Sequence, residues 1–429
     1  KAVKTKKDEI YLSNGIKLID CISSWWTACH GYNNSYILKK VTNQLNSMPH
    51  IMFGGIIHDQ AIKLSCRIVE LLDKKLEKVF FSDSGSVAIE IAMKMSIQYW
   101  LNKGFKNKKK FIHFRNGYHG DTAGAMSVCD PEEGMHAIFT NYLNKNFIAD
   151  IPTNKNLEKK LALLLKKNSE QIAGLIIEPL IQCAGGMKFY HKDILEKINK
   201  MAKKYKILII YDEIATGFGR TGSMFAFQQT KSFPDILCLG KAITGGIMSL
   251  AATVSTKMIF DAFLSKNHNK EFMHGPTYMA NPLACSAANA SLDIFEKTDV
   301  LLKVKKIEKL FFQKLHSFEK YEFVVDVRIL GAIAVIEIDK LSSKRIKWLK
   351  KEFIKNGIWI RPLRNVIYLM PPFIIKKKNL IKAINALGVS STYTSANHTV
   401  IGATDTPADV STLSVSMVGS NQMQLQWTP

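Results

Sequence analysis

The sequence predicts an α/β fold, in which a large, mainly parallel sheet carries helices on both faces and a smaller α+β domain follows. Between about residues 50 and 290, short β-branched or aromatic runs alternate with longer helical stretches, the pattern of parallel strands joined by helices. The chain has 429 residues, 47% of them hydrophobic, which is enough to bury a large core. Polar or glycine-rich residues follow each apolar run, and ligands of such sheets bind beyond the carboxyl ends of the strands.

The predicted domain order follows from these patterns. Residues 51–290 would form the large domain, with strands at 79–82, 110–114, 175–178, 207–211 and 236–239. Residues 291–387 would form the smaller α+β domain, with a long helix at 291–320, a strand-like stretch at 325–338 and a helix at 343–355. Residues 388–429 contain no Lys or Arg and are rich in Ser and Thr. We expect this tail to be disordered, or to be a non-native cloning scar, fusion or frame change.

Composition restricts the function classes. The formal charge of +23 raises the alternative of a nucleic-acid-binding protein. The lysines, however, are spread over helices that also carry Glu, which is typical of solvated faces, so we expect no nucleic-acid partner. No apolar run is long enough to span a membrane. The seven cysteines show no C-x-x-C spacing, so we expect no disulfide framework, no metal site and a cytoplasmic location.

The first motif that indicates chemistry lies after the strand predicted at 79–82. The residues Ser84-Gly85-Ser86 lead from this strand into an amphipathic helical run. Free backbone N–H groups at the start of a helix, together with the helix dipole, suit a phosphate group. An ordinary serine-capped helix is the alternative.

Two further strands end in charged residues. Asp212 follows the apolar run 207–211, and Lys241 follows the run 236–239 between glycines. An Asp there could keep a pyridine nitrogen protonated, and a desolvated Lys could attack an aldehyde. Taken singly, the Asp could be a solvated loop acid or a metal ligand, and the Lys a surface charge. Together with the phosphate site, in this order along one sheet, they predict a pyridoxal-phosphate site.

The sequence also resembles a known family. It is similar to the class III aminotransferases of fold type I, and within them to the diaminopelargonate synthases of biotin biosynthesis, from about residue 9 to 387. The motifs that carry the resemblance, besides 82–90, are Ser23-Ser24-Trp25-Trp26, His30-Gly31-Tyr32-Asn33, Met52-Phe53-Gly54-Gly55, Gly117-Tyr118-His119-Gly120-Asp121-Thr122, residues 212–222 and 239–246, His274-Gly275-Pro276-Thr277 and Trp359-Ile360-Arg361-Pro362.

The resemblance implies how pyridoxal 5'-phosphate would be held. Lys241 would bond to the aldehyde carbon and transfer the proton, Asp212 would pair with the ring nitrogen, and Gly85 and Ser86 would grip the phosphate. Tyr118 would lie on the ring and border the substrate, although a core tyrosine is the alternative.

The resemblance also implies a homodimer. Thr277, next to Pro276, would reach the phosphate of the cofactor in the neighbouring subunit, so the active sites would lie at the subunit interface. Residues 1–50 would be the N-terminal part of the small domain. They would be truncated, because the family's Trp-His-Pro-Tyr segment, which contributes a tyrosine to the active site, does not occur in this sequence.

Six further residues are implied at the substrate site. Trp25 and Trp26 would wall an apolar channel, and Arg361 could clamp a distant carboxylate. A buried tryptophan pair that is plain core is the alternative. Arg220 would bind an anion or merely tie a turn, and Asp121 would orient Tyr118 or face the amino donor. Gly275 would border the substrate.

The reaction implied is a ping-pong transamination. An amino group would pass from S-adenosylmethionine to 8-amino-7-oxononanoate and give 7,8-diaminononanoate, with lysine as an open alternative donor. The alternative enzymes are another class III ω-aminotransferase that acts on a diamine or amino acid, or an aminomutase of the same fold. These would share Lys241 and Asp212 but would not need Trp25, Trp26 and Arg361 together.

Overall fold

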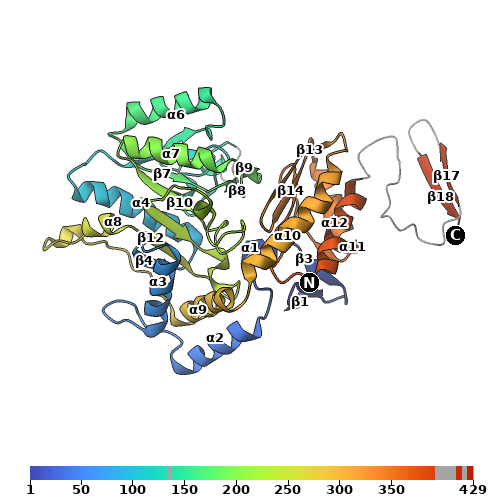
Figure 1. The fold of residues 1–429 in the computed structure, drawn as a ribbon, viewed down its shortest axis with the longest axis horizontal. Coiled ribbons are helices and arrows are strands. Elements are labelled where there is room, and N and C mark those ends of the chain that lie inside the picture. Colours follow the sequence, from blue (N-terminus) through green and yellow to red (C-terminus); the bar gives the residue numbers. More distant parts are fainter. Residues whose placement is uncertain (133–136, 392–411, 418–422, 429) are drawn as a thin grey trace.

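The computed structural model describes residues 1–132, 137–391, 412–417 and 423–428. Within these residues a seven-stranded sheet forms the centre of the large domain (Figure 1). One strand, β12, is antiparallel to both of its neighbours, and the other strands run parallel to one another. The predicted α/β fold with a mainly parallel sheet is confirmed. The spatial order is β4 (Lys78–Ser82), β12 (Ala251–Ser255), β11 (Ile236–Leu239), β10 (Leu208–Asp212), β7 (Ile172–Ile177), β5 (Lys110–Phe114) and β6 (Phe147–Ala149).

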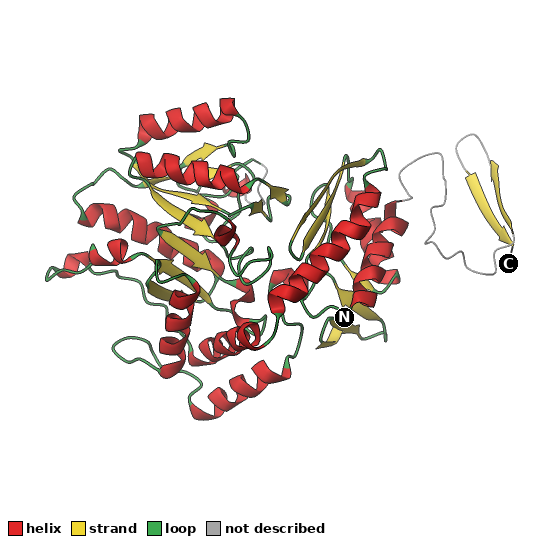
Figure 2. Cartoon of the chain, viewed as in Figure 1, coloured by secondary structure: helices red, strands yellow, loops and turns green. Residues whose placement is uncertain are grey.

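Helices cover both faces of this sheet (Figure 2). Successive side chains of a strand point to opposite faces, so β10 buries Leu208 and Ile210 on one face and Ile209 and Tyr211 on the other. The first pair packs in one core with α4 (Gly85–Asn102). The second pair belongs to the core formed with α3 (Asp59–Leu71), α6 (Lys155–Asn168) and α7 (Lys192–Lys204).

The small domain is built from both ends of the region that the family resemblance covers. The strand β3 (Lys17–Asp20) pairs in parallel with β15 (Ile358–Trp359), so the start of the chain joins a four-stranded sheet with a segment far along the sequence. This sheet also contains β1 (Ala2–Lys6) and β2 (Glu9–Leu12). The rest of the small domain consists of β13 (Val324–Leu330), β14 (Ile333–Ile338), β16 (Val366–Leu369), α10 (Val300–Leu315), α11 (Ser343–Lys355) and α12 (Lys377–Ser391).

One helix from the N-terminal region belongs with the large domain. The helix α2 (Ser35–Ser47) packs against α9 (Pro282–Lys297) rather than against the small-domain sheets. The exact domain boundaries stay a prediction. The remaining elements are α1 (Ser23–Trp26), α5 (Ala123–Met126), α8 (Lys257–Asp261), η1 (Ala137–Phe139), η2 (Ala226–Gln229), η3 (Lys241–Thr244), η4 (His268–Lys270), η5 (His316–Phe318), β8 (Ile181–Gln182) and β9 (Lys188–Phe189).

Two predicted elements are wrong in detail. The single helix expected at 291–320 is divided between α9 and α10, because Thr298 has extended backbone angles and its hydroxyl donates to the carbonyl of Ile294 at 2.8 Å, which competes with helical hydrogen bonds. The stretch at 325–338 is a hairpin that turns at Gly331. Gly331 has φ +58°, and a Cβ atom there would lie 2.5 Å from the carbonyl carbon of Thr221, so glycine is required.

The C-terminal tail is partly described. The helix α12 extends to Ser391, and β17 (Thr412–Met417) pairs antiparallel with β18 (Met423–Thr428). The rest of the tail lies outside the described residues, so its predicted disorder or non-native origin stays a prediction. Over the described ranges, none of the helices combines the length and apolar character that crossing a bilayer requires.

The start of β5 depends on a buried lysine. Lys108 is 3% exposed, and its amine donates to the carbonyl oxygens of Ser169, Ile172 and Lys206 at 2.8, 3.3 and 3.2 Å. The same amine lies 4.2 Å from the centre of the Trp100 ring. Burial lowers the pKa of Lys108. This one side chain therefore ties together the segments that lead into β5, β7 and β10.

We expect Lys108→Met to lower the free energy of unfolding by about 2–4 kcal/mol, because it withdraws a charged donor from three carbonyl groups. Urea denaturation followed by circular dichroism would measure the change. The exposed neighbour gives a matched control, since Lys109→Met should stay within about 0.5 kcal/mol of the original protein. Equal effects of the two substitutions would contradict the role assigned to Lys108.

Candidate active site

Lys241 and Asp212 lie at the tips of two neighbouring strands. The strands β10 and β11 are parallel, with Asp212 opposite Cys238, and Lys241 begins the turn η3 just beyond β11. Lys241 has φ +45°, and a non-glycine residue in this left-handed region is strained, a condition that is common at functional sites. Both residues line one cavity of about 160 Å³. The structure therefore brings the two principal predicted residues together.

The same cavity contains several other predicted residues. Its lining includes Trp26, Gly85, Ser86 and Tyr118 in addition to Lys241 and Asp212. Gly85, Ser86, Tyr118, Asp212 and Lys241 meet because they follow or end β4, β5, β10 and β11, whose carboxyl ends all point to the same edge of the sheet. Trp26 comes from α1, after a strand of the small domain. The lining also includes residues that were not predicted, which are His119, Gly120, Glu178, Ala184, Ile214 and Ala215.

His119 is the partner of the Asp212 carboxylate. One carboxylate oxygen of Asp212 lies 2.7 Å from Nδ1 of His119, and the other accepts the backbone N–H of Ile214 at 3.0 Å. Both side chains are buried, and a buried carboxylate needs such partners. The sequence analysis missed this role, although His119 lies within the motif at 117–122. A second polar residue beside Tyr118 was the signal that could have indicated it.

Glu178 is the second residue that the sequence analysis missed. It follows β7, and its two carboxylate oxygens accept the backbone N–H groups of Cys183 at 3.0 Å and Tyr118 at 3.2 Å. Burial raises the pKa of Glu178 to about 7; His119 acts against this shift and Asp212 adds to it. The available signal was the one used for Asp212, an acid at the end of an apolar run.

The N-terminus of α4 forms one wall of the cavity. Ser84 caps this helix by accepting the N–H of Val87 at 3.4 Å, and the first N–H groups of a helix have no partner within the helix. A Cβ atom on Gly85 would meet Ile214 at 2.9 Å, so glycine leaves the approach to these N–H groups open. The hydroxyl of Ser86 accepts the N–H of Asp121 at 3.0 Å. This wall fits a phosphate group.

These features together fit pyridoxal phosphate. A cradle suited to phosphate, a buried carboxylate and a lysine amine line one cavity, and they are the groups that its phosphate, its ring nitrogen and its aldehyde require. Tyr118 adds an aromatic face, and its hydroxyl donates to Asp121 at 2.8 Å. Burial raises the pKa of Tyr118. Of the two roles predicted for Asp121, this contact matches the orientation of Tyr118.

Of the predicted substrate residues, Trp26 lines this cavity, and Trp25 and Arg361 contact each other. The amine of Lys241 is 4.9 Å from the ring centre of Trp26, and the guanidinium of Arg361 is 4.7 Å from that of Trp25. Trp26 is 6% exposed, whereas Trp25 is 56% exposed. Trp26 also packs edge to face against Tyr368. Trp25 is therefore not plain core, whereas Trp26 belongs to a buried apolar cluster as well as to the cavity wall.

Arg220 has a different place from the one expected for a substrate ligand. It is 1% exposed, and its guanidinium donates to the carbonyl oxygens of Pro371 at 2.8 Å and Ala332 at 3.4 Å. Burial lowers the pKa of Arg220 to about 10. These contacts favour the alternative, an arginine that ties a turn, because its donors already bind backbone groups of the small domain.

Gly275, Pro276 and Thr277 lie on the loop before α9. Within the described part of the chain they do not line the cavity around Lys241, and Gly275 and Thr277 are exposed. The predicted contact of Thr277 is with the cofactor of a neighbouring subunit, and it stays a prediction.

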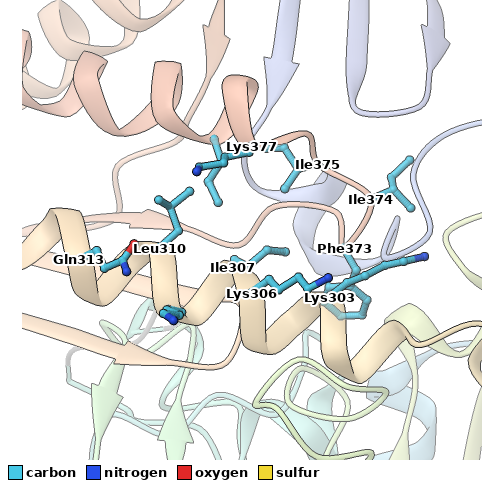
Figure 3. Close-up of a pocket in the computed structure, with 11 residues that line it drawn as sticks. Lys303, Lys306, Ile307, Leu310, Gln313, Phe373, Ile374, Ile375 and Lys377 are labelled. Carbon is cyan, nitrogen blue, oxygen red and sulfur yellow. The ribbon is translucent and has the colours of Figure 1, made fainter.

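A larger cavity, of about 610 Å³, lies in the small domain. Figure 3 shows lysine side chains, among them Lys303 and Lys306 of α10, around a floor that includes Ile307 and Leu310. None of the predicted site residues lines this cavity. The chemistry therefore belongs to the smaller cavity at the strand tips.

Relatives of the chain were found by sequence. Residues 1–389 match the family model described as aminotransferase class III. The adenosylmethionine-8-amino-7-oxononanoate aminotransferase of Buchnera aphidicola subsp. Schizaphis graminum is 46% identical over 90% of this chain and 90% of its own length. The enzyme of the same name from Saccharomyces cerevisiae is 37% identical over 87% of this chain and 86% of its own.

Solved structures agree with the sequence comparison. The adenosylmethionine-8-amino-7-oxononanoate aminotransferase of Methanocaldococcus jannaschii has a TM-score of 0.87 and 36% identity, over 91% of this chain and 92% of that one. A PLP-bound amine transaminase from an uncultivated Pseudomonas species has a TM-score of 0.84 and 29% identity, over 91% and 94%. With its lysine, aspartate and helix N-terminus at one sheet edge, the chain belongs to the class III aminotransferase family.

Proposed function

We propose that this aminotransferase uses pyridoxal phosphate to transfer an amino group from S-adenosylmethionine to 8-amino-7-oxononanoate, which gives 7,8-diaminononanoate in biotin biosynthesis. The observation that carries the proposal is the single cavity lined by Lys241, Asp212 and the N-terminus of α4. The names of relatives that are 37–47% identical over most of the chain support the choice of substrates. We place the reaction in the cytoplasm.

The cofactor would be held by four groups of this chain. Gly85 and Ser86 would bind its phosphate, Asp212 would face its ring nitrogen, and Lys241 would bond to its aldehyde carbon. Bound pyridoxal phosphate supplies a conjugated ring that takes up the electron pair left when the carbon bearing the amino group loses its proton. Asp212 can keep the ring nitrogen protonated because His119, 2.7 Å away, holds the carboxylate in place.

Lys241 would act as the base and acid of the proton transfer. Its amine lies over the Trp26 ring, and its backbone is held just beyond β11, where Lys241 lines the cavity. A positioned amine can remove a proton from the amino donor and return it to the cofactor without leaving the site. Tyr118, fixed through Asp121, would border the substrate.

The substrate walls would come from the small domain. Trp25 and Trp26 offer apolar surface for an aliphatic chain, and Arg361, in contact with Trp25, would bind a carboxylate at the far end. A related transaminase with another substrate would keep Lys241 and Asp212 but would not need all three of these residues. Trp26 lines the cavity and the neighbouring Trp25 contacts Arg361, which supports an acceptor that has both an apolar chain and a carboxylate.

A homodimer is part of the proposal. Met52, Ile57, Met273 and Tyr278 are between 58% and 80% exposed in the single chain. The two segments that carry them lie side by side, because the rings of His50 and Tyr278 are 4.5 Å apart. Exposed apolar residues gathered in this way indicate an interaction surface. Thr277 belongs to the same surface, where a second subunit would bring its cofactor within reach.

The direct test uses the purified full chain with pyridoxal phosphate, S-adenosylmethionine and 8-amino-7-oxononanoate. Mass spectrometry should detect 7,8-diaminononanoate, and omission of either substrate should abolish it. Replacing S-adenosylmethionine with lysine distinguishes the two donors. Amination of simple amines or amino acids in place of the oxo acid would show that the chain is another ω-aminotransferase.

We expect Lys241→Ala to lose at least about 10²–10⁴-fold of the turnover rate, since Lys241 supplies the one side-chain amine among the described residues that line the cavity. Steady-state kinetics would measure this loss. Binding of the cofactor should persist through the phosphate contacts, as followed by fluorescence titration. Lys257→Ala is the control, because Lys257 forms only a surface ion pair with Asp261. Turnover close to that of the original enzyme in Lys241→Ala would refute the assignment.

Glu178 should make stability depend on pH near neutrality. Its pKa is about 7 in the folded protein, raised by burial from an ordinary 4.5. Between these two values the folded state holds a proton that the unfolded state has released, so the contribution of Glu178 to stability is complete below about pH 4.5 and is lost as the pH rises through about 7.

We therefore expect the stability advantage of the original protein over Glu178→Gln to shrink from pH 5 to pH 8. Urea denaturation midpoints of both proteins across this range would measure it, with the exposed Glu170→Gln as control. A constant difference between the original protein and Glu178→Gln would mean that Glu178 does not titrate in this range.

A further inference from the structure

The segment that presents the two tryptophans has an unusual backbone. Ser23, Ser24, Trp25 and Trp26 have φ angles of 48°, 49°, 58° and 74°, so four consecutive non-glycine residues lie in the left-handed region. L-residues visit this region singly, because Cβ crowds the following carbonyl oxygen. Such a run persists only where its surroundings determine it strongly.

Asp20 makes several of the hydrogen bonds that hold this left-handed backbone in place. It ends β3 with a fully buried side chain. One carboxylate oxygen accepts the backbone N–H of Ile22 at 2.9 Å, and the other accepts the backbone N–H of Ser24 at 2.8 Å. The hydroxyl of Tyr32 donates to the second oxygen as well. The carboxylate thus binds the backbone just before and within the left-handed run.

The far side of the turn is held separately. The hydroxyl of Ser23 donates to the carbonyl oxygen of Met370 at 2.7 Å, and the N–H of Trp26 donates to the carbonyl oxygen of Ile22 at 2.9 Å. The side chains of the turn make two further contacts: the Trp26 ring contacts the amine of Lys241, and the Trp25 ring contacts the guanidinium of Arg361. A change in the turn would therefore move both rings relative to the lysine and the arginine.

We propose that Asp20 is a positioning residue for substrate specificity, which holds the left-handed turn so that Trp25 and Trp26 wall the acceptor site. Asp20 itself does not line the cavity in the described residues, so it acts through the two tryptophans. This inference rests on the proposed function, since it assigns the rings to the oxo-acid acceptor.

The carboxylate matches its partners in a way that an amide cannot. Two N–H groups and one hydroxyl donate to its two oxygens. The amide of Asn has one oxygen, so its NH₂ group would face a backbone N–H and leave one donor unpaired. Asp20→Asn therefore changes few atoms and still weakens the hold on the turn.

The test compares the steady-state kinetics of the full-length Asp20→Asn enzyme with those of the original. We expect the KM for 8-amino-7-oxononanoate to rise about tenfold while kcat stays within about threefold, because the acceptor wall moves and the proton-transfer groups do not. Asp8→Asn is the matched control. Asp8 is a buried carboxylate in the connection between β1 and β2 of the same sheet, and its side chain binds Asn379 rather than the left-handed turn. This substitution should leave the KM unchanged.

A second substitution separates positioning from a merely structural role. Ser24 is exposed and has φ 49°, and glycine adopts this conformation without a Cβ penalty. Ser24→Gly should therefore restore much of the KM in the Asp20→Asn background. A purely structural loss, seen as a lower melting temperature with a fall in kcat, would not be repaired in this way and would overturn the proposal.

The remaining outcomes are also decisive. An unchanged KM in folded Asp20→Asn overturns the role of Asp20, whereas an original enzyme that does not aminate 8-amino-7-oxononanoate overturns the proposed function instead. If Asp20→Asn does not fold, Tyr32→Phe removes a single hydrogen bond to the same carboxylate. It should raise the same KM by a smaller factor, and its failure to do so counts against the proposal.

Discussion

The parallel pairing of β10 with β11 is the constraint on which the site depends. Because the two strands run in the same direction, both carboxyl ends reach one edge of the sheet, and Asp212 and Lys241 line one cavity. The strand β7, which pairs with β10 in the same direction, brings Glu178 to this edge. Only β12 reverses direction among the described strands of this sheet, and it contributes no residue to the lining of the cavity.

Holding these groups together is costly, and the surrounding core provides the stability. Burial raises the pKa of Glu178, and repulsion by the nearby Asp212 carboxylate adds to this rise. Lys241 has a left-handed backbone, which costs about 1–3 kcal/mol. Backbone N–H groups and His119 offset part of the electrostatic cost. Apolar packing on both faces of the sheet offsets the rest of the free-energy cost.

The sequence was sufficient to predict the residues whose environment is set locally. Asp212, Lys241 and Gly85 each follow an apolar strand, so periodicity and the turn residues indicate both the element and its polar end. His119 escaped notice because its importance comes from a contact with Asp212 that no local pattern encodes. Glu178 follows an apolar strand as Asp212 does, and only its contacts with Cys183 and Tyr118 distinguish it from an ordinary loop acid. The strand β12, with Ala251 and Ala252 at its start, has a weak strand pattern and acquires its structure from pairing with β4 and β11. Arg220 was ambiguous for the converse reason, because a guanidinium can bind carbonyl groups as well as anions.

The same rule of parallel strands operates twice in this chain. In the small domain, β3 and β15 are parallel with Asp20 opposite Trp359, so the segments that follow them, which carry Trp25 and Arg361, emerge at one edge and their side chains meet. In the proposed function, the edge of the large sheet carries the chemistry and the edge of a small one carries the substrate walls. Since different strands build the two edges, substitutions in the small sheet can alter the walls without moving Lys241 or Asp212. A fold divided in this way can keep one set of catalytic strand ends while the second edge changes, because fold alone does not fix the substrate.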